Sequence, residues 1–156
     1  MFSHPWQVKS RFSPDAMRNI EKAISASEKA HAGEIRLVVE AGLHPIEIWC
    51  KKTPKKRAIE LFGRLNIWDT EHNNGVLIYL LLADRDVEIV ADRGIDKHVG
   101  HDGWEQICRE METLFRAAEF EAGVLQGIEK IGAHLQQHFP QNGASKNEVT
   151  NKPLLM

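Results

Sequence analysis

Apolar residues recur at helical spacing in four segments of the chain. Ser13 followed by Pro14 is a typical start signal for the first segment, because serine caps free backbone amides and proline suits the first helical position. Thr53 and Pro54 repeat this signal before the second segment. The pattern predicts helices over residues 12–31, 53–68, 104–119 and 120–139.

Three further segments have the apolar patterns of β-strands. Residues 34–40 are short and rich in β-branched side chains, and residues 76–83 are apolar at almost every position, so both are predicted to be buried strands. Residues 86–91 alternate between polar and apolar, and Asp84 with Arg85 forms the turn before them. The last two strands are therefore predicted to form a tight β-hairpin.

The order of these elements predicts the class of fold. A helix joins the first two strands, so we expect them to be parallel with a right-handed crossover. The whole order predicts a three-layer α/β/α sandwich: a small mixed sheet containing one β-hairpin, with helices on both faces. We expect an N-terminal arm over 1–12, one domain over 13–140 and a disordered, polar C-terminal tail over 141–156.

Composition limits the expected partners and compartment. The 156 residues suffice for one domain with a buried core. The net charge of -2, from 20 basic and 22 acidic residues, gives no bulk attraction to nucleic acid or to a membrane surface, and no specific nucleic-acid partner is expected. The longest apolar run is too short to span a bilayer, and no signal peptide is expected. Two cysteines fit a reducing compartment, so we expect a cytoplasmic protein.

The hairpin separates two copies of nearly the same tetrapeptide, ADRD at residues 83–86 and ADRG at 91–94. The first copy forms the turn, and the second is carried back to the end of the sheet where the strand at residue 76 begins. The extended chain between them places Asp84 and Asp92 about 26 Å apart. Only the second copy is therefore a candidate functional site.

Several carboxylates are predicted to gather at that end, because the two parallel strands begin side by side there. Oxygen-rich loops suit a hard divalent cation, whereas imidazoles would also admit a transition metal. We therefore predict a cation site, with Ca²⁺ or Mg²⁺ as the expected ion and Zn²⁺ as the alternative. A solvated acidic rim, balanced by Arg93 and Lys97, is the competing interpretation. The predicted ligands are Glu34, Glu71, Asp92, Asp96 and Asp102, with His31, His72, His98 and His101 nearby.

No familiar nucleophile motif accompanies these carboxylates. The stretch that follows Cys50 lacks the glycines of a phosphate-binding loop, and its arginine is one residue late. Asp84 and Asp86 fit a phosphoaspartate motif, but Glu88 stands where that motif needs threonine or valine. The five basic residues between 51 and 57 lie at a predicted helix N-terminus, which leaves an anionic partner open.

Two stretches carry a family resemblance, NNGVLIYLLLADRDVEIVADRGID at 73–96 and FRAAEFEAGVLQGIEKI at 115–131. Together they resemble the TPM domain family, named for its thylakoid-lumen, photosystem-associated and acetylcholine-receptor-modulator members. The resemblance covers about residues 14–138. Asn73 stands where the family has aspartate, and Asp92 replaces the first glycine of its Gly-x-Gly loop. The matching positions are Asn74, Gly75, Val76, Asp84, Arg85, Gly94, Ile95, Phe115, Arg116, Glu119 and Phe120.

The resemblance implies an α/β/α sandwich with a divalent-metal site, and acid-phosphatase activity like that reported for the plant-lumen branch. Two functional hypotheses follow. One is a binding or adaptor module whose metal-steadied loop holds an unidentified protein partner. The other is a metal-dependent, acid-phosphatase-like hydrolase of phosphomonoesters, which would bind a small phosphorylated ligand. Because no nucleophile motif is recognisable, we favour the binding module, and whether the protein is an enzyme stays open.

Overall fold

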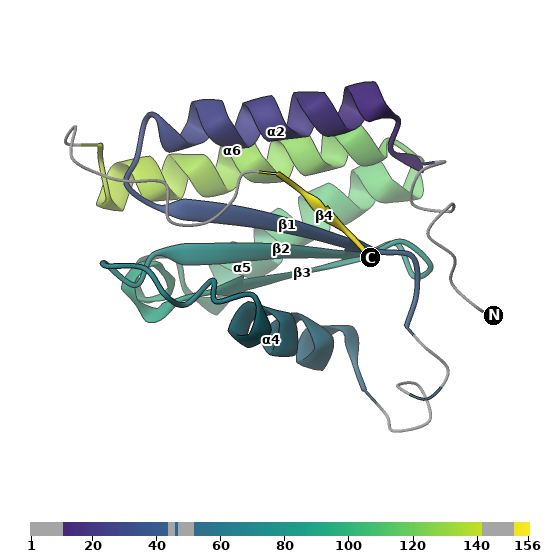
Figure 1. Ribbon diagram of the computed structural model, residues 1–156, viewed down its shortest axis with the longest axis horizontal. Coiled ribbons are helices and arrows are strands. Elements are labelled where there is room, and N and C mark those ends of the chain that lie inside the picture. The colour runs from purple at the N-terminus through teal and green to yellow at the C-terminus, as the bar shows by residue number, and fades with distance from the viewer. Residues whose placement is uncertain (1–10, 44–45, 47–51, 142–151) are drawn as a thin grey trace.

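The computed structural model describes residues 11–43, 46, 52–141 and 152–156. A mixed β-sheet lies at its centre with helices on both faces (Figure 1), which confirms the predicted α/β fold and its hairpin. The elements are α2 (Pro14–Glu28), β1 (Glu34–Glu40), α4 (Pro54–Arg64), β2 (Gly75–Leu81), β3 (Asp86–Ala91), α5 (Arg93–Arg116), α6 (Phe120–His138) and β4 (Leu154–Leu155).

The strands are ordered β3-β2-β1-β4 across the sheet. β1 and β2 run parallel, with Glu34 opposite Gly75 and Glu40 opposite Leu81, as expected for strands joined through a helix. β2 and β3 are antiparallel and joined by a short turn. This order leaves β3 and β4 as the two edges of the sheet.

The two faces of the sheet carry helical layers of unequal size. α2, α5 and α6 cover one face and enclose the larger core cluster, in which Ile24, Val39 and Phe115 are buried. α4 covers the other face, over a smaller cluster that includes Leu61 and Tyr79. Alternate residues of β2 join one cluster and then the other, which explains why every residue of this strand is buried and apolar or glycine.

α5 is longer than the sequence pattern predicts. The pattern predicts a helix that starts at residue 104, but the helix begins at Arg93. The side chain of Asp92 caps it by accepting a hydrogen bond from the N–H of Arg93. Gly100 interrupts the helix with φ 75° and ψ 168°, a conformation that glycine adopts without the strain a Cβ would bring. This kink breaks the helical period, and so periodicity alone missed the first piece of the helix.

The end of the chain adds the fourth strand. β4 pairs in parallel with β1, where Leu154 lies opposite Val38, and the N–H of Met156 donates to the carbonyl of Val39. The structure thus differs from the expected disordered tail over 141–156 at its last residues. A strand of two residues is too short to produce an apolar pattern in the sequence, which is why it was not predicted.

The start of the described chain is packed against the domain. Phe12, within the predicted arm over 1–12, is buried with its ring centroid 6.2 Å from that of Phe120. Residues 1–10 of the arm and 142–151 of the tail lie outside the described residues. Among the helices that the structure describes, none is long and apolar enough to cross a membrane.

Candidate functional site

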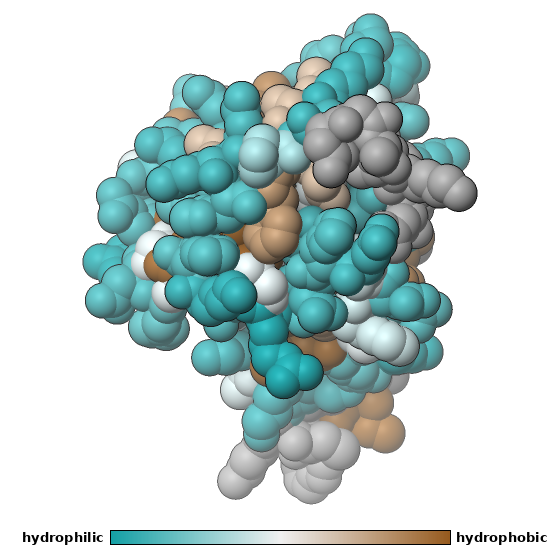
Figure 2. Space-filling view, turned by 90° about the vertical axis from the view of Figure 1, so that its left-hand side faces the viewer, coloured by the Kyte–Doolittle hydropathy of each residue, from teal (hydrophilic) through white to brown (hydrophobic). Residues whose placement is uncertain are grey.

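We call the end of the sheet where β1 and β2 begin the acidic pole. Its five predicted ligands are Glu34, Glu71, Asp92, Asp96 and Asp102. Glu34 lies opposite Gly75 in the β1–β2 pairing, and the N–H of Asp92 donates to the carbonyl of Gly75 at 3.0 Å. The predicted return of residue 92 to the beginning of β2 is therefore confirmed. Figure 2 views this end of the molecule, where hydrophilic side chains cover most of the surface around a few apolar residues.

The five carboxylates do not form a common ligand set in this arrangement. Asp92 caps α5, and Asp96 accepts a 2.8 Å hydrogen bond from an indole N–H of the same helix. Glu34 is only 3% exposed, whereas Glu71 and Asp102 are exposed. Across the described ranges, no group of three or more His, Cys, Asp or Glu side chains could hold a metal ion. The divalent cation and its ligands therefore stay a prediction from the sequence.

Two of the histidines predicted near this end pack against the end of α6. The ring of His98 stacks on that of His138, with centroids 4.0 Å apart and planes inclined by 10°. His72 stacks on Phe139 with centroids 6.5 Å apart. These rings contribute to packing between α5, the loop before β2 and α6.

A carboxyl pair at the acidic pole, in which Glu34 is buried and Glu28 half-buried, was not predicted. Glu28, at the end of α2, shares a hydrogen bond with Glu34, and its Oε2 accepts from the N–H of Ile35 at 3.0 Å. Burial, together with the hydrogen bond and charge of Glu34, raises the pKa of Glu28 to about 9. A signal was present in the sequence, because Glu28 continues the apolar stripe of Ile20 and Ile24 at four-residue spacing.

His31 is another buried polar side chain at this pole, with 1% exposure. Its Nδ1 accepts a hydrogen bond from the N–H of Gly33 at 3.1 Å, and its Nε2 lies 2.9 Å from the hydroxyl of Ser27. Because Nδ1 is an acceptor, Nε2 carries the proton of the neutral ring and donates to Ser27. Burial lowers the pKa of His31 to about 4, so the ring is neutral at physiological pH.

Replacing Glu28 with glutamine is expected to stabilise the protein above neutral pH. The pKa of about 9 in the folded chain exceeds the ordinary value of 4.5, so between these values the folded chain holds a proton that the unfolded chain releases. The free energy of unfolding therefore falls as the pH rises, by up to about 1.4 kcal/mol per pH unit, and glutamine removes this loss. His31 does not interfere above about pH 7, because its pKa is lowered.

Urea unfolding at several pH values between about 7 and 9 measures this effect. The exposed Glu21, on the same helix, provides the control substitution Glu21→Gln, which should keep the slope of the unmodified chain. The prediction is wrong if Glu28→Gln keeps the same slope as the control.

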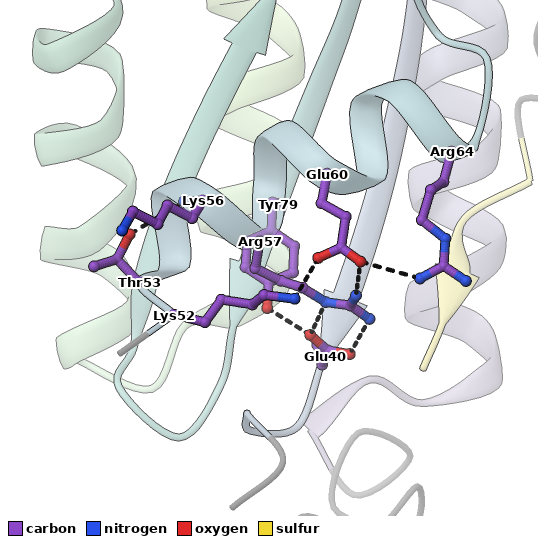
Figure 3. A network of polar contacts seen from close by, with 8 residues as sticks. All are labelled: Glu40, Lys52, Thr53, Lys56, Arg57, Glu60, Arg64 and Tyr79. Carbon is purple, nitrogen blue, oxygen red and sulfur yellow. Dashed lines mark hydrogen bonds and ion pairs between the residues drawn. The ribbon is translucent and has the colours of Figure 1, made fainter. Parts of the chain in front are cut away.

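A buried polar network fixes α4 against the sheet (Figure 3). Arg57 of α4 donates from Nε to Oε1 of Glu40 at 3.0 Å and from Nη2 to Oε2 at 3.1 Å, so the carboxylate is held at two points. The hydroxyl of Tyr79, on β2, donates to the same Oε1 at 2.6 Å. Glu60 contacts Arg57 at 3.5 Å and Lys52 at 2.5 Å. The network ties α4 to β1 and β2.

A groove runs between α4 and α5, and we call it the β3 groove because residues 88–91 of β3 form its floor. Its cavity volume is about 270 Å³. Ile59 of α4, which is 52% exposed, lies on one wall. Trp104, Glu105 and Cys108 of α5 lie on the other. The groove therefore combines an apolar surface with an acidic side chain.

The floor of the β3 groove is a strand edge. In an antiparallel pair, every second residue of a strand forms backbone hydrogen bonds with the neighbouring strand. Because Asp92 bonds to Gly75 of β2, the residues of β3 that bond to β2 are those at even positions. The backbone groups of Val87, Ile89 and Ala91 consequently point away from β2. The N–H of Val87 donates to a carboxylate of α5, whereas those of Ile89 and Ala91 make no hydrogen bond within the described part of the chain.

The fold and the sequence together define the family of this chain. It is an α/β sandwich whose residues 9–134 match the model of the TPM domain. The chain belongs to the TPM domain family, as the sequence motifs predict. No curated protein sequence matches it significantly.

Solved structures share this fold. The BA42 protein from the psychrophilic bacterium Bizionia argentinensis, solved by NMR, is 29% identical, with 93% of this chain and 95% of that one covered and a TM-score of 0.82. The N-terminal domain of a protein from P. gingivalis is 15% identical, with 90% and 94% covered and a TM-score of 0.68. The N-terminal domain of cg2496 protein from Corynebacterium glutamicum is 12% identical, with 88% and 80% covered and a TM-score of 0.61. The last two likenesses concern the fold alone.

Proposed function

We propose that this TPM domain is a protein-binding module that captures an extended segment of a partner along the β3 groove. The observation that carries the proposal is the edge of β3, where the backbone groups of Ile89 and Ala91 point away from the sheet beside a cavity. An extended chain added at such an edge gains main-chain hydrogen bonds, and adjoining pockets select its side chains.

The local chemistry of the edge supports this proposal. Strand edges are usually short, covered or protected by charge, because they otherwise pair with other chains. β3 is six residues long, and its Ile89 and Val90 are half-buried apolar side chains beside the unpaired backbone. A partner strand would bury this apolar surface and satisfy the backbone groups at the same time.

The alternative hypothesis, hydrolysis of phosphomonoesters, stays a prediction from the family resemblance. The thiol in the β3 groove is a poor nucleophile for such a reaction. Burial, followed by the charges of nearby carboxylates, raises the pKa of Cys108 to about 12, so the thiol is protonated at neutral pH. We therefore propose binding as the function of this groove.

The proposal predicts that Ala91→Pro abolishes peptide binding without unfolding the domain. The N–H of Ala91 points away from β2, so proline removes a donor from the groove and leaves the pairing of β2 with β3 in place. Random peptides of about ten residues, the length of a long strand, are selected on the full chain by phage display. Selected peptides should shift the amide NMR signals of β3 and should not bind Ala91→Pro.

Ala91→Ser is the matched control, because serine is also small but retains the backbone N–H. It should bind the selected peptides as the unmodified chain does. Peptides that bind Ala91→Pro with full affinity, or an absence of any enriched peptide, would contradict the proposed function.

A further inference from the structure

The chemistry of the β3 groove also indicates what kind of segment it binds, and this inference rests on the proposed function. We infer that the bound segment is basic, with lysine or arginine side chains that pair with carboxylates on the floor and on the α5 wall of the groove. Glu88 of β3 and Glu105 of α5 line the groove. Asp86 and Glu112 add their charge at Cys108, which also lines it.

These four carboxylates act on one point of the groove, the thiol of Cys108. After burial, the negative charges of Glu88, Glu112, Glu105 and Asp86 all contribute to the raised pKa of that thiol. Two of them, Glu88 and Glu105, line the groove together with Cys108. The groove therefore carries a concentration of negative charge beside its unpaired strand edge.

Basic side chains of the chain itself balance this charge only in part. Lys55 on α4 acts on Glu88, and Arg116 acts on Glu112. Arg109 lies 3.9 Å from Glu105, but its side chain is 71% exposed, and exposed pairs contribute little. A basic partner segment would neutralise more of this negative charge next to the unpaired backbone groups of β3.

Two of the carboxylates lie where their charged form is disfavoured. Burial and the neighbouring charges of Asp86 and Glu105 raise the pKa of Glu88. Burial, followed by the hydrogen bond and charge of Asp86, raises the pKa of Glu112 to about 7. A raised carboxyl pKa means that the ionised form is disfavoured, and a nearby cation would stabilise that form.

Strand geometry places acidic side chains on both faces of an added strand. Glu88 belongs to the face of β3 that is turned toward α4, because its neighbours Val87 and Ile89 pack into the core on the opposite face. Glu105, on α5, lies on that opposite face. Successive side chains of a bound segment point alternately to these two faces, so basic residues at odd or at even positions each meet a carboxylate.

The same charges argue against a second copy of this chain as the occupant. Pairing of β3 with β3 of another copy would place the Asp86 and Glu88 side chains of both copies along one strand pair. Like charges opposite one another across a strand pair are destabilising. A basic segment from a different protein therefore fits this edge better than self-association does.

The test uses two labelled probe peptides of about ten residues, which is a long strand. In one peptide pairs of lysines alternate with pairs of threonines, which puts lysine on both faces of a bound strand, and in the other glutamate replaces every lysine. Fluorescence polarisation with the full chain at about 50 mM salt, where screening is weak, gives the two dissociation constants. The lysine peptide should bind at least about tenfold more tightly than the glutamate peptide.

Neutralising the groove should reverse this preference. Glu88→Gln with Glu105→Gln is expected to weaken the lysine peptide about tenfold and to strengthen the glutamate peptide. The matched control is Glu21→Gln with Glu129→Gln, which removes two exposed carboxylates from α2 and α6 and should leave both affinities unchanged. Glu105→Lys, at an exposed position, is a second variant that tests the charge if the double variant fails to fold.

The outcomes separate this inference from the proposed function. Equal affinity for the two probes, or a lysine peptide unaffected by Glu105→Lys, overturns the basic segment and leaves strand addition standing. Failure of both probes while display-selected peptides bind also overturns it. Failure of the probes and of every selected peptide overturns the proposed function itself.

Discussion

Replacement of Arg57 by methionine is expected to lower the free energy of unfolding by about 3–5 kcal/mol. The Arg57 side chain is only 8% exposed and holds both oxygens of Glu40, whose side chain is 12% exposed. Methionine fills similar space but leaves the Glu40 carboxylate buried with the Tyr79 hydroxyl as its remaining donor in this network. An uncompensated buried charge is more costly than the loss of the ion pair itself.

The double variant Glu40→Gln with Arg57→Met separates these two effects. It removes the unpaired buried charge of Glu40, so much of the lost stability should return. Arg64→Met, on the same helix but 67% exposed, is the control and should change stability by less than about 1 kcal/mol. Urea unfolding of the four chains measures the differences, and an Arg57→Met loss no larger than that of the control would refute the expectation.

Gly75→Ala is expected to destabilise the protein by about 3 kcal/mol or more, at or beyond the upper end of ordinary overpacking. A Cβ at Gly75 would overlap the backbone carbonyl oxygen of Ile67. Backbone cannot move aside as a flexible side chain can, and Gly75 is held at the start of β2 opposite Glu34. The substitution must therefore displace either the strand or the loop before it.

Gly63→Ala is the matched control for this substitution. Nothing lies within 4 Å of a Cβ built at Gly63, which is in α4. Alanine has the better helix propensity, so this variant should gain about 0.5–1 kcal/mol. Thermal or urea unfolding should move the two variants in opposite directions, and equal midpoints would show that the close approach at Gly75 does not matter.

The fold could be predicted from the sequence wherever a local pattern determines structure. Ser13 and Thr53 accept the capping hydrogen bonds expected of them. The continuous apolar run beginning at Val76 reflects a strand with a helical layer on each face. The first part of α5 and the strand β4 were missed, because one depends on a kink at Gly100 and the other on pairing with Val38.

The candidate site was less predictable, because it depends on tertiary contacts. The hairpin correctly placed Asp92 beside the beginning of β2, but the sequence could not show that its side chain is used to cap a helix. The burial of Glu34 depends on how α2 packs, although Glu28 on the apolar stripe was a readable signal. The β3 groove was not predicted, since the sequence did not determine which strand would lie at an edge.

The single helix over one face of the sheet has a consequence for how the native state fluctuates. α4 has eleven residues, and its buried residues are Arg57, Ala58 and Leu61, so releasing it exposes far less apolar surface than releasing α2, α5 and α6 together. A native protein opens locally in the units that lose the least stabilising contact when they are released. Amide hydrogen exchange detects such local openings at free energies below that of global unfolding. α4 is therefore expected to open before the larger helical layer, and the Arg57–Glu40 contact opposes this opening. Because α4 is also a wall of the β3 groove, this opening would widen the groove while the larger layer stays folded.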